Sequence, residues 1–232
     1  MDIEEYSKYR QFYNEDIPEL LLKYINKNNW NNYLDLGCGD GSLLNALNKK
    51  GYLDNKTVYA VDLSENRINL VKKINKNFIC LVGDACNIKN IQDGKIDFLV
   101  SSQVIEHVKS DGDMVKEIYR LMNKDGVVYI STVFKKWYGW YFYRCNNKWT
   151  LDPTHLREYN TDNQLLDIFV KNSFDILENR KVLVKRSIVD FFLKRVGGDR
   201  DVFIKYPFLK FIRNLNMPIF GYYNWEIVCK KI

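Results

Sequence analysis

The sequence has no apolar run that approaches the roughly 20 residues needed to span a bilayer. Its first five residues, Met-Asp-Ile-Glu-Glu, are acidic and lack the basic-then-apolar order of a secretory signal peptide. Both absences argue against export and against membrane insertion. We therefore expect a cytoplasmic protein without a transmembrane segment.

Cysteine, histidine and proline are also scarce. The five cysteines are scattered, odd in number and form no C-x-x-C pair, which argues against a disulfide framework and against a zinc site. Only four prolines occur, and no repeat or low-complexity segment suggests a linker, so the 232 residues are predicted to form a single domain, residues 1–232. With only two histidines in the chain, each is a candidate for proton chemistry near neutral pH.

Apolar and basic residues, in contrast, are plentiful. Apolar residues make up 46% of the chain and aromatic residues 15%, which excludes global disorder and allows a large core. The net charge is +6, but residues 176–232 hold twelve Lys and Arg against five acidic residues, whereas residues 1–175 hold 23 against 24. The basic C-terminal quarter is either a solvated face or a contact for an anionic partner.

The order of predicted elements indicates an α/β fold. Short β-branched runs alternate with amphipathic stretches over the first 150 residues, a pattern typical of a parallel sheet. Strands are predicted at 33–36, 57–61, 78–82, 96–100 and 127–133, and helices at 17–29, 41–50, 65–75 and 111–122. Beyond an aromatic segment, a helix is predicted at 161–172 with Thr161 as its cap, followed by strands at 174–184 and 221–230. Short helices are predicted at 187–196 and 208–215.

A glycine-rich turn between the first predicted strand and helix carries the strongest signal. Residues 34–42 read Leu-Asp-Leu-Gly-Cys-Gly-Asp-Gly-Ser. The glycines let the backbone turn tightly beside a ligand, and the helix N-terminus that follows offers free N–H groups. The spacing is G-x-G-x-G, and Asp35 precedes Gly37 by two residues, where it would repel a pyrophosphate. A cofactor with a cationic, amino-acid-like end suits this turn better.

Two more carboxylates follow the next two predicted strands. Asp62 ends the second strand, where a carboxylate can accept hydrogen bonds from both hydroxyls of a ribose. Asp84 follows the third strand, where it could accept one from the exocyclic amine of adenine. Three carboxylates at successive strand ends, beside a glycine turn, predict a nucleoside-binding crevice.

Motifs at 34–42, 60–64, 83–86 and 97–108 together resemble the class I S-adenosylmethionine-dependent methyltransferases, and among them the small-molecule and ubiquinone-type O-methyltransferases. The resemblance implies a Rossmann-like, mostly parallel seven-stranded α/β sheet with an antiparallel last strand. It also implies S-adenosyl-L-methionine as cofactor and S-adenosyl-L-homocysteine as product. The implied cofactor contacts are Gly37 and Gly39 along the methionine part, Asp35 beneath it, Asp62 at the ribose, Leu63 and Ala85 with Asp84 at the adenine, and Gln103 at the amino-acid end.

The segment after the fourth predicted strand bears on acceptor and metal. Methyltransferases of exocyclic base amines resemble one another in a [D/N]-P-P-[Y/F] motif that Ser-Ser-Gln-Val, at 101–104, lacks. Some quinone-type relatives hold a divalent metal with Glu-x-x-Glu-His. Here Glu106 and His107 remain, but Gln103 replaces the first glutamate, and a neutral amide is a poorer ligand for a hard cation. We therefore predict no metal.

His155 lies in the second segment that could carry chemistry. It follows the aromatic stretch at 137–143, and loops after strand ends line the site in such sheets. A histidine there could remove the proton of a hydroxyl as the methyl group transfers. We predict His155 as a catalytic residue, with His107 as a second candidate, and thus an oxygen acceptor. Each histidine also has a structural alternative. His155 could anchor its loop by a hydrogen bond, and His107 could pack at the start of a helix.

The remaining predictions concern the acceptor and the partners. Residues 30–133 form the expected cofactor-binding core, residues 1–30 a helical cap, and segments 134–160 and 184–220 substrate-side inserts. Tyr6, Tyr9 and Tyr13 could close over the cofactor. The expected acceptor is a small molecule or a glycan-type metabolite, with RNA or protein, or an inactive scaffold, as alternatives. Segment 184–220 could cap the substrate, form a homodimer or touch an anionic membrane surface.

Overall fold

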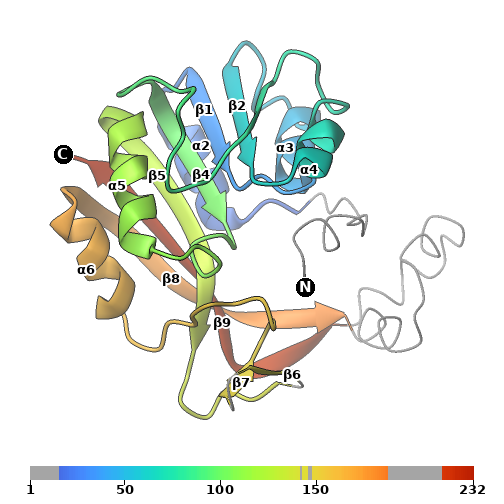
Figure 1. Ribbon diagram of the computed structural model, residues 1–232, viewed down its shortest axis with the longest axis vertical. Helices are drawn as coiled ribbons and strands as arrows, with labels where there is room; N and C mark the ends of the chain where they lie inside the picture. Colours follow the sequence, from blue (N-terminus) through green and yellow to red (C-terminus); the bar gives the residue numbers. More distant parts are fainter. Residues whose placement is uncertain (1–15, 142, 146–147, 188–215) are drawn as a thin grey trace, which may run out of the picture.

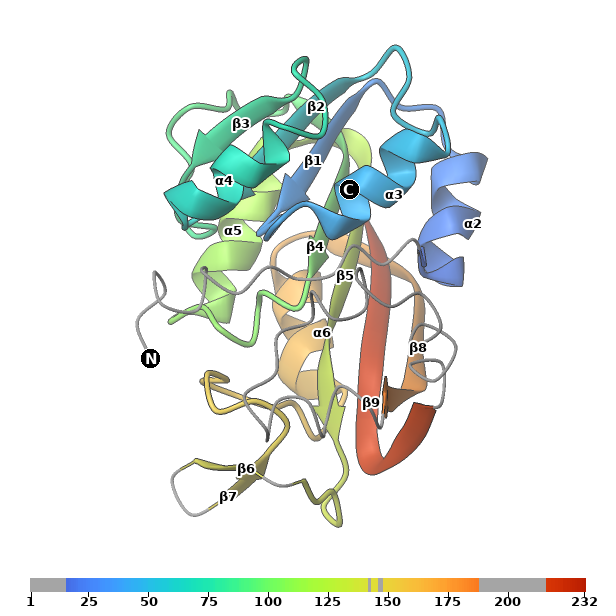
Figure 2. The same cartoon turned by 90° about the vertical axis from the view of Figure 1, so that its right-hand side faces the viewer.

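A twisted sheet between two layers of helices forms the body of the protein (Figures 1 and 2). The structure is a computed structural model, and it describes residues 16–141, 143–145, 148–187 and 216–232. The strands of the main sheet are β1 (Asn32–Leu36), β2 (Thr57–Asp62), β3 (Ile79–Val82), β4 (Ile96–Ser102), β5 (Met122–Lys135), β8 (Phe174–Ser187) and β9 (Asn216–Lys231). A separate small hairpin consists of β6 (Tyr143–Cys145) and β7 (Lys148–Thr150).

The seven strands of the main sheet follow the order β3-β2-β1-β4-β5-β9-β8. Strands β1 to β5 pair in parallel, whereas β9 runs antiparallel to both β5 and β8. The predicted Rossmann-like α/β sheet with a reversed last strand is therefore confirmed. This order places the carboxyl ends of β1, β2, β3 and β4 at one edge, which is where ligands bind in sheets of this kind.

Helices cover both faces of the sheet. Helices α2 (Glu19–Lys27), α3 (Ser42–Lys49) and α4 (Glu65–Val71) lie on one face, and α5 (Asp111–Leu121) and α6 (Asn163–Lys171) lie on the other (Figure 2). Strand residues alternate between the two cores: Tyr33 packs with the α2–α3 layer, and Leu34 packs with the α5–α6 layer. Both side chains are fully buried, and each buried side chain of this size contributes roughly 1.5–3 kcal/mol.

Helix starts follow local capping chemistry where a hydroxyl is available. The side chain of Ser64 accepts from the N–H of Arg67 at the start of α4, as predicted, and Ser110 caps α5 in the same way. The predicted cap at Thr161 is wrong, because α6 begins after Asp162 with no side-chain cap.

The side chain of Gln164 reaches back instead and accepts from the N–H groups of Asn160 and Thr161. The backbone N–H groups before α6 thus find their acceptor on a residue inside the helix. A search for Ser or Thr before the helix does not reveal such an acceptor.

The predicted inserts are only partly described. In segment 134–160, the end of β5 is followed by the β6–β7 hairpin, which the irregular aromatic pattern did not predict. The predicted helices at 187–196 and 208–215, and Tyr6, Tyr9 and Tyr13, lie outside the described residues. Among the residues that the structure describes, no helix is long and apolar enough to cross a membrane.

Candidate active site

The glycine turn after β1 adopts the left-handed backbone that its sequence predicts. Gly37 and Gly39 have φ angles of 77° and 57°. A β-carbon at Gly37 would lie 2.3 Å from Cγ2 of Val104, so Gly37 is required for packing against the segment after β4. Among the residues that the structure describes, a β-carbon at Gly39 would meet nothing within 4 Å. Gly39 thus leaves open space beside the turn, in the place where a ligand would approach.

Asp62, at the end of β2, is held against this turn. Its Oδ2 accepts from the N–H of Gly39 at 2.9 Å, and its Oδ1 accepts from the N–H of Ser64 at 2.9 Å. Nη1 of Arg67 lies 3.8 Å from Oδ2. The carboxylate is therefore fixed in orientation, and each of its oxygens keeps lone-pair capacity for a further donor.

Asp35 is a buried carboxylate at the same edge. It is 3% exposed, and no ion pair joins it within the described part of the chain. Burial, and secondarily the charge of Asp62, raises the pKa of Asp35 to about 7. A cation placed beside these two carboxylates would restore the ionised form. The pair therefore fits a ligand with a positive charge.

The predicted adenine-side residues offer an apolar surface beside a carboxylate. Leu63 is 53% exposed although it directly follows a buried strand end, and Ala85 is 9% exposed. Oδ1 of Asp84 accepts from the N–H of Cys86 at 2.9 Å, which orients the turn after β3. An exposed leucine beside such a turn is suited to packing against a planar ring.

Two residues of α5 that the sequence analysis did not single out hold the loop beyond this turn. Oε1 of Glu117 accepts from the N–H of Ile88 at 2.6 Å. Arg120 donates to the carbonyls of Ile88 and Ile91 at 2.7 and 3.1 Å, and it also pairs with Glu117. The i, i+3 spacing of Glu117 and Arg120 on one helix was the signal available in the sequence.

Gln103 sits at the end of β4 with a φ angle of 56°, a left-handed conformation that costs a residue other than glycine roughly 1 kcal/mol or more. Its N–H donates to the carbonyl of Ser131 at 2.8 Å, and its Nε2 donates to Oδ1 of Asn224 on β9 at 3.0 Å. The side chain is thus engaged with β9. A contact with the amino-acid end of the cofactor stays a prediction.

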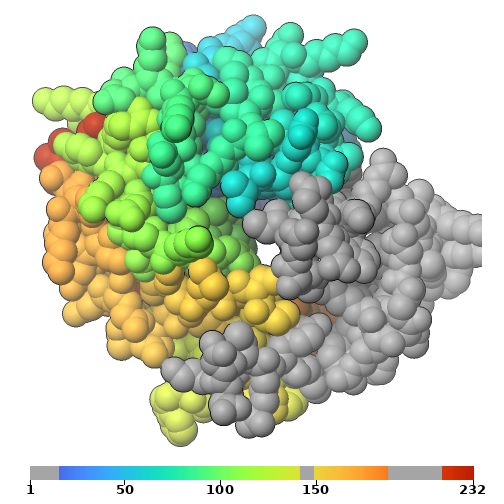
Figure 3. Space-filling view, in the orientation of Figure 1, coloured from blue at the N-terminus to red at the C-terminus, as the bar shows by residue number. Residues whose placement is uncertain are grey.

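The two histidines, which lie far apart in the sequence, meet in the structure. His107 follows β4, and His155 belongs to the loop between β7 and α6. Their ring centroids are 4.9 Å apart in an edge-to-face arrangement. Glu106 completes a cluster whose three candidate ligand atoms all lie within 4.8 Å of one another. Figure 3 shows the green segment after β4 beside the yellow segment after β7.

Backbone and arginine contacts attach the loop of His155 to the turn of His107. The N–H groups of Leu156 and Arg157 both donate to the carbonyl of Glu106, at 3.0 and 3.4 Å. The guanidinium of Arg157 donates to the carbonyls of Ile105 and Lys109, at 2.9 and 2.7 Å. The two histidine-bearing segments therefore form one unit.

Glu106 is the buried carboxylate of this cluster. Its Oε2 accepts from Oγ1 of Thr132 at 2.8 Å, whereas Oε1 is buried and has no hydrogen-bond partner among the described residues. Burial raises the pKa of Glu106. Desolvation, followed by the charge of His155, lowers the pKa of His107, although this residue keeps contact with solvent.

One carboxylate and two imidazoles form a donor set that could hold a borderline divalent cation. The prediction that no metal binds was based on the missing C-x-x-C pair and on Gln103, and it did not include His155 as a donor. The absence of a metal at this cluster therefore stays a prediction.

Comparisons with known proteins find methyltransferases similar to this chain. Residues 34–130 match a family of methyltransferase domains. The ubiquinone biosynthesis O-methyltransferase of Pelagibacter ubique is 25% identical over 178 residues, which cover 69% of this chain and 72% of that protein. The malonyl-[acyl-carrier protein] O-methyltransferase of Marinomonas sp. is 27% identical over 190 residues, which cover 76% of this chain and 64% of that protein. Part of each relative thus has no counterpart in the matched region.

Solved structures share the fold at low identity. A methyltransferase structure from Bacillus halodurans aligns with a TM-score of 0.64 at 16% identity and covers 91% of this chain and 97% of that one. A SAM-dependent methyltransferase from Aquifex aeolicus aligns with a TM-score of 0.57 at 17% identity and covers 92% and 89% of the two chains.

Asp35, Gly39, Asp62, Leu63 and Asp84 form the cofactor edge of the sheet. This edge and the fold are together typical of a Rossmann-like methyltransferase. The family match, these relatives and the neighbouring structures support a class I S-adenosylmethionine-dependent methyltransferase with S-adenosyl-L-methionine as its cofactor.

Proposed function

We propose that this methyltransferase transfers the methyl group of S-adenosylmethionine to a hydroxyl oxygen of a small-molecule or glycan-type acceptor, with His155 as general base. The observation that carries the proposal is the cluster of Glu106, His107 and His155 at the end of β4. The printed names of the two relatives, both O-methyltransferases, support an oxygen acceptor.

The cofactor edge offers suitable partners for the parts of S-adenosylmethionine. The open space at Gly39 would admit the methionine part above Asp35. Asp62 would accept from the ribose hydroxyls, and the exposed side chain of Leu63 would pack against the adenine, with Asp84 accepting from its amine. The cofactor, when bound, supplies an electrophilic methyl group on a positively charged sulfur.

The protein's part in the reaction is to place the acceptor and to receive its proton. In-line displacement needs the attacking oxygen close to the methyl carbon, and holding it there supplies much of the acceleration. As the new O–C bond forms, the hydroxyl proton moves to the lone pair of Nε2 of His155, which acts as the general base. A neutral amine acceptor would not need this base.

The alternatives are less well supported. The basic C-terminal quarter suggested an RNA or protein acceptor, but several of its cations serve the fold: Arg180 pairs with Glu226, Lys181 with Asp162, and Lys230 with Asp125. An inactive scaffold would not need the oriented carboxylate of Asp62. The homodimer and membrane-contact predictions concern a segment that is mostly outside the described residues, and they stay predictions.

A panel of hydroxylated small molecules tests the proposal. Purified protein is incubated with S-adenosylmethionine and each compound, and S-adenosylhomocysteine and the methylated product are measured together. We expect turnover with at least one hydroxyl acceptor and a loss of about 100-fold or more in kcat for His155→Ala. Leu156→Ala, an exposed position of the same loop, is the matched control.

Three results would contradict the proposal. Turnover retained by His155→Ala would remove the base. Methylation confined to RNA, with a steep dependence on salt, would replace the acceptor class. Calorimetric binding of the cofactor without turnover on any acceptor would favour a scaffold.

A further inference from the structure

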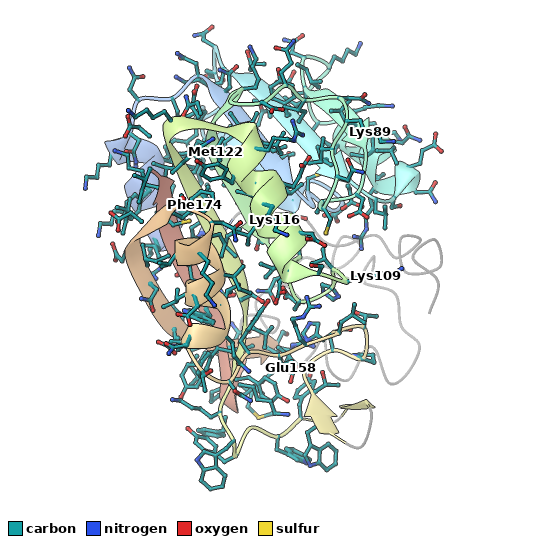
Figure 4. All side chains as sticks on the ribbon, turned by 60° about the vertical axis from the view of Figure 1, so that its left-hand side comes forward. Lys89, Lys109, Lys116, Met122, Glu158 and Phe174 are labelled. Atoms are coloured by element: carbon teal, nitrogen blue, oxygen red, sulfur yellow. The ribbon has the colours of Figure 1, made fainter. Side chains whose placement is uncertain are left out.

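Glu158 is the charged partner of His155. Oε1 of Glu158 lies 3.1 Å from Nδ1 of the imidazole, and the two side chains are 9% and 5% exposed. Figure 4 shows Glu158 in the loop that lies below Lys109 and below the N-terminal end of α5. The sequence analysis did not single out Glu158. It lies three residues after His155 but in an irregular loop, where spacing predicts no contact.

Glu158 is itself held in place by several donors. Its Oε1 also accepts from Oγ1 of Thr150 and from the N–H of Leu151, at 2.8 and 2.7 Å. Nζ of Lys135 lies 3.7 Å from its Oε2. Burial alone would raise the pKa of Glu158, but hydrogen bonds from His155, Leu151 and Thr150 together lower it. The carboxylate is therefore ionised near neutral pH and acts only as an acceptor.

An acceptor at Nδ1 decides the tautomer of a neutral imidazole. Because the Glu158 carboxylate can only accept, Nδ1 of His155 carries the proton and Nε2 keeps its lone pair. His107 is arranged in the same way, since its Nδ1 lies 3.2 Å from the carbonyl oxygen of Thr154. Both rings thus present an unprotonated Nε2 rather than a donor.

We infer that Glu158 is the positioning residue of the proposed base: it holds His155 in the Nδ1–H tautomer, directs Nε2 toward the acceptor hydroxyl and stabilises the imidazolium that forms. This inference rests on the proposed function. The acceptor oxygen donates its electron pair to the methyl carbon, and the C–S bond breaks with its pair left on sulfur. The hydroxyl proton moves to Nε2, and the resulting imidazolium returns it to water.

The charges around His155 make this assignment specific. Glu158 faces the ring from its own loop, together with Asp152, whereas Glu106 and His107 face it from the turn after β4. Lys135 on β5 and the hydroxyl of Tyr222 on β9 also approach Glu158. Glu158 is the carboxylate in hydrogen-bond contact with the ring nitrogen.

Glu158→Gln tests the inference in the full chain. We expect kcat to fall roughly 100-fold with the KM for S-adenosylmethionine unchanged within about twofold, because the amide can donate to Nδ1 and favour the wrong tautomer. The acid limb of the kcat profile should move to lower pH, since the imidazolium loses its anionic partner. Glu158→Asp should restore part of kcat. Glu178→Gln, a surface glutamate paired with Lys23, is the matched control.

A measurement on the unaltered protein covers the case in which Glu158→Gln does not fold. Spectra of protein with ¹⁵N-labelled histidine, assigned by His107→Gln, should show His155 with the proton on Nδ1 at neutral pH. A proton on Nε2 would overturn the inference.

The remaining outcomes separate this inference from the proposed function. If His155→Ala abolishes turnover while Glu158→Gln behaves as wild type with an unmoved pH profile, the base stands and the role of Glu158 is refuted. If His155→Ala retains turnover, both fail. If EDTA abolishes turnover and a divalent cation restores it, His155 is a metal ligand and the inference is overturned.

Discussion

The backbone N–H of Gly39 donates to the carboxylate of Asp62 at 2.9 Å, which ties the glycine turn after β1 to the end of β2. Two parts of the cofactor edge that come from different βα units are therefore set relative to each other before any ligand binds. Such preorganisation reduces the loss of conformational entropy that cofactor binding must offset. Asp62 would serve both the turn and the ribose.

Asp62→Ala should remove both functions of this carboxylate. We expect cofactor affinity to fall 100-fold or more by calorimetry and the free energy of unfolding to fall by about 1–3 kcal/mol, because the N–H groups of Gly39 and Ser64 lose their acceptor. The fold should remain. Glu65→Ala, an exposed position at the start of α4, controls for charge. Unchanged cofactor affinity would refute the assignment of Asp62 to the ribose.

Gly37→Ala should mainly lower the stability of the fold, whereas Gly39→Ala should mainly lower the affinity for the cofactor. At Gly37 the new methyl group would clash with Val104, so we expect a loss of more than about 2 kcal/mol in unfolding free energy, partly restored by Val104→Ala. At Gly39 the methyl group meets no atom of the described part of the chain within 4 Å, so the loss should be about 1 kcal/mol of backbone strain, while cofactor affinity falls. Urea unfolding and calorimetry measure the two effects. Equal effects on both quantities would contradict this division.

Asp35→Asn should stabilise the cofactor-free protein at high pH. The carboxyl has a pKa of about 7 in the fold against an ordinary value of 3.8, so the folded state binds more protons between these values. Its contribution to the unfolding free energy is therefore fully present below about pH 4 and decreases by roughly 4 kcal/mol as the pH rises from there to about 7.

Urea unfolding at pH 5 and pH 8 checks this sign. The wild type should lose more stability between the two pH values than Asp35→Asn does, whereas cofactor affinity should be weaker in the variant at both. Cofactor affinity of the wild type should decline below pH 7, as Asp35 takes up a proton. A variant less stable than wild type at pH 8 would contradict the assignment.

Arg120→Met should act on the cofactor through the loop after β3. The substitution removes the donors to the carbonyls of Ile88 and Ile91, and we expect the loop to loosen and the KM for S-adenosylmethionine to rise about tenfold with a smaller change in kcat. Lys116→Met, an exposed position of the same helix, is the matched control. Equal KM values in the two variants would show that the loop is set by other contacts.

The cofactor edge could be predicted from the sequence because its information is local. Glycines with left-handed backbone, carboxylates directly after β-branched strands and serine caps all act within a few residues of the chain. The fold class followed from the same alternation. The β6–β7 hairpin and the start of α6 could not be predicted, because the hairpin has no regular period and the N–H groups before α6 are bonded by Gln164 from inside the helix.

The cluster of candidate proton-transfer residues has a different origin. Sequence analysis selected His107 and His155 separately, and it missed that Glu158 lies against His155. These contacts depend on the extension of β5 beyond β4, which lets the chain after β7 run beside it: the N–H of Lys135 donates to the carbonyl of Tyr159. No local pattern reveals such an alignment.

The amino-acid sequence alone determined the methyltransferase class and the cofactor, because strand ends in a parallel sheet bring their following residues to one edge whatever the loops do. Only the tertiary structure decided which histidine meets which carboxylate and which carboxylates are buried. Tautomer and pKa depend on neighbours within a few ångströms and on exclusion of water, and packing between distant segments sets both.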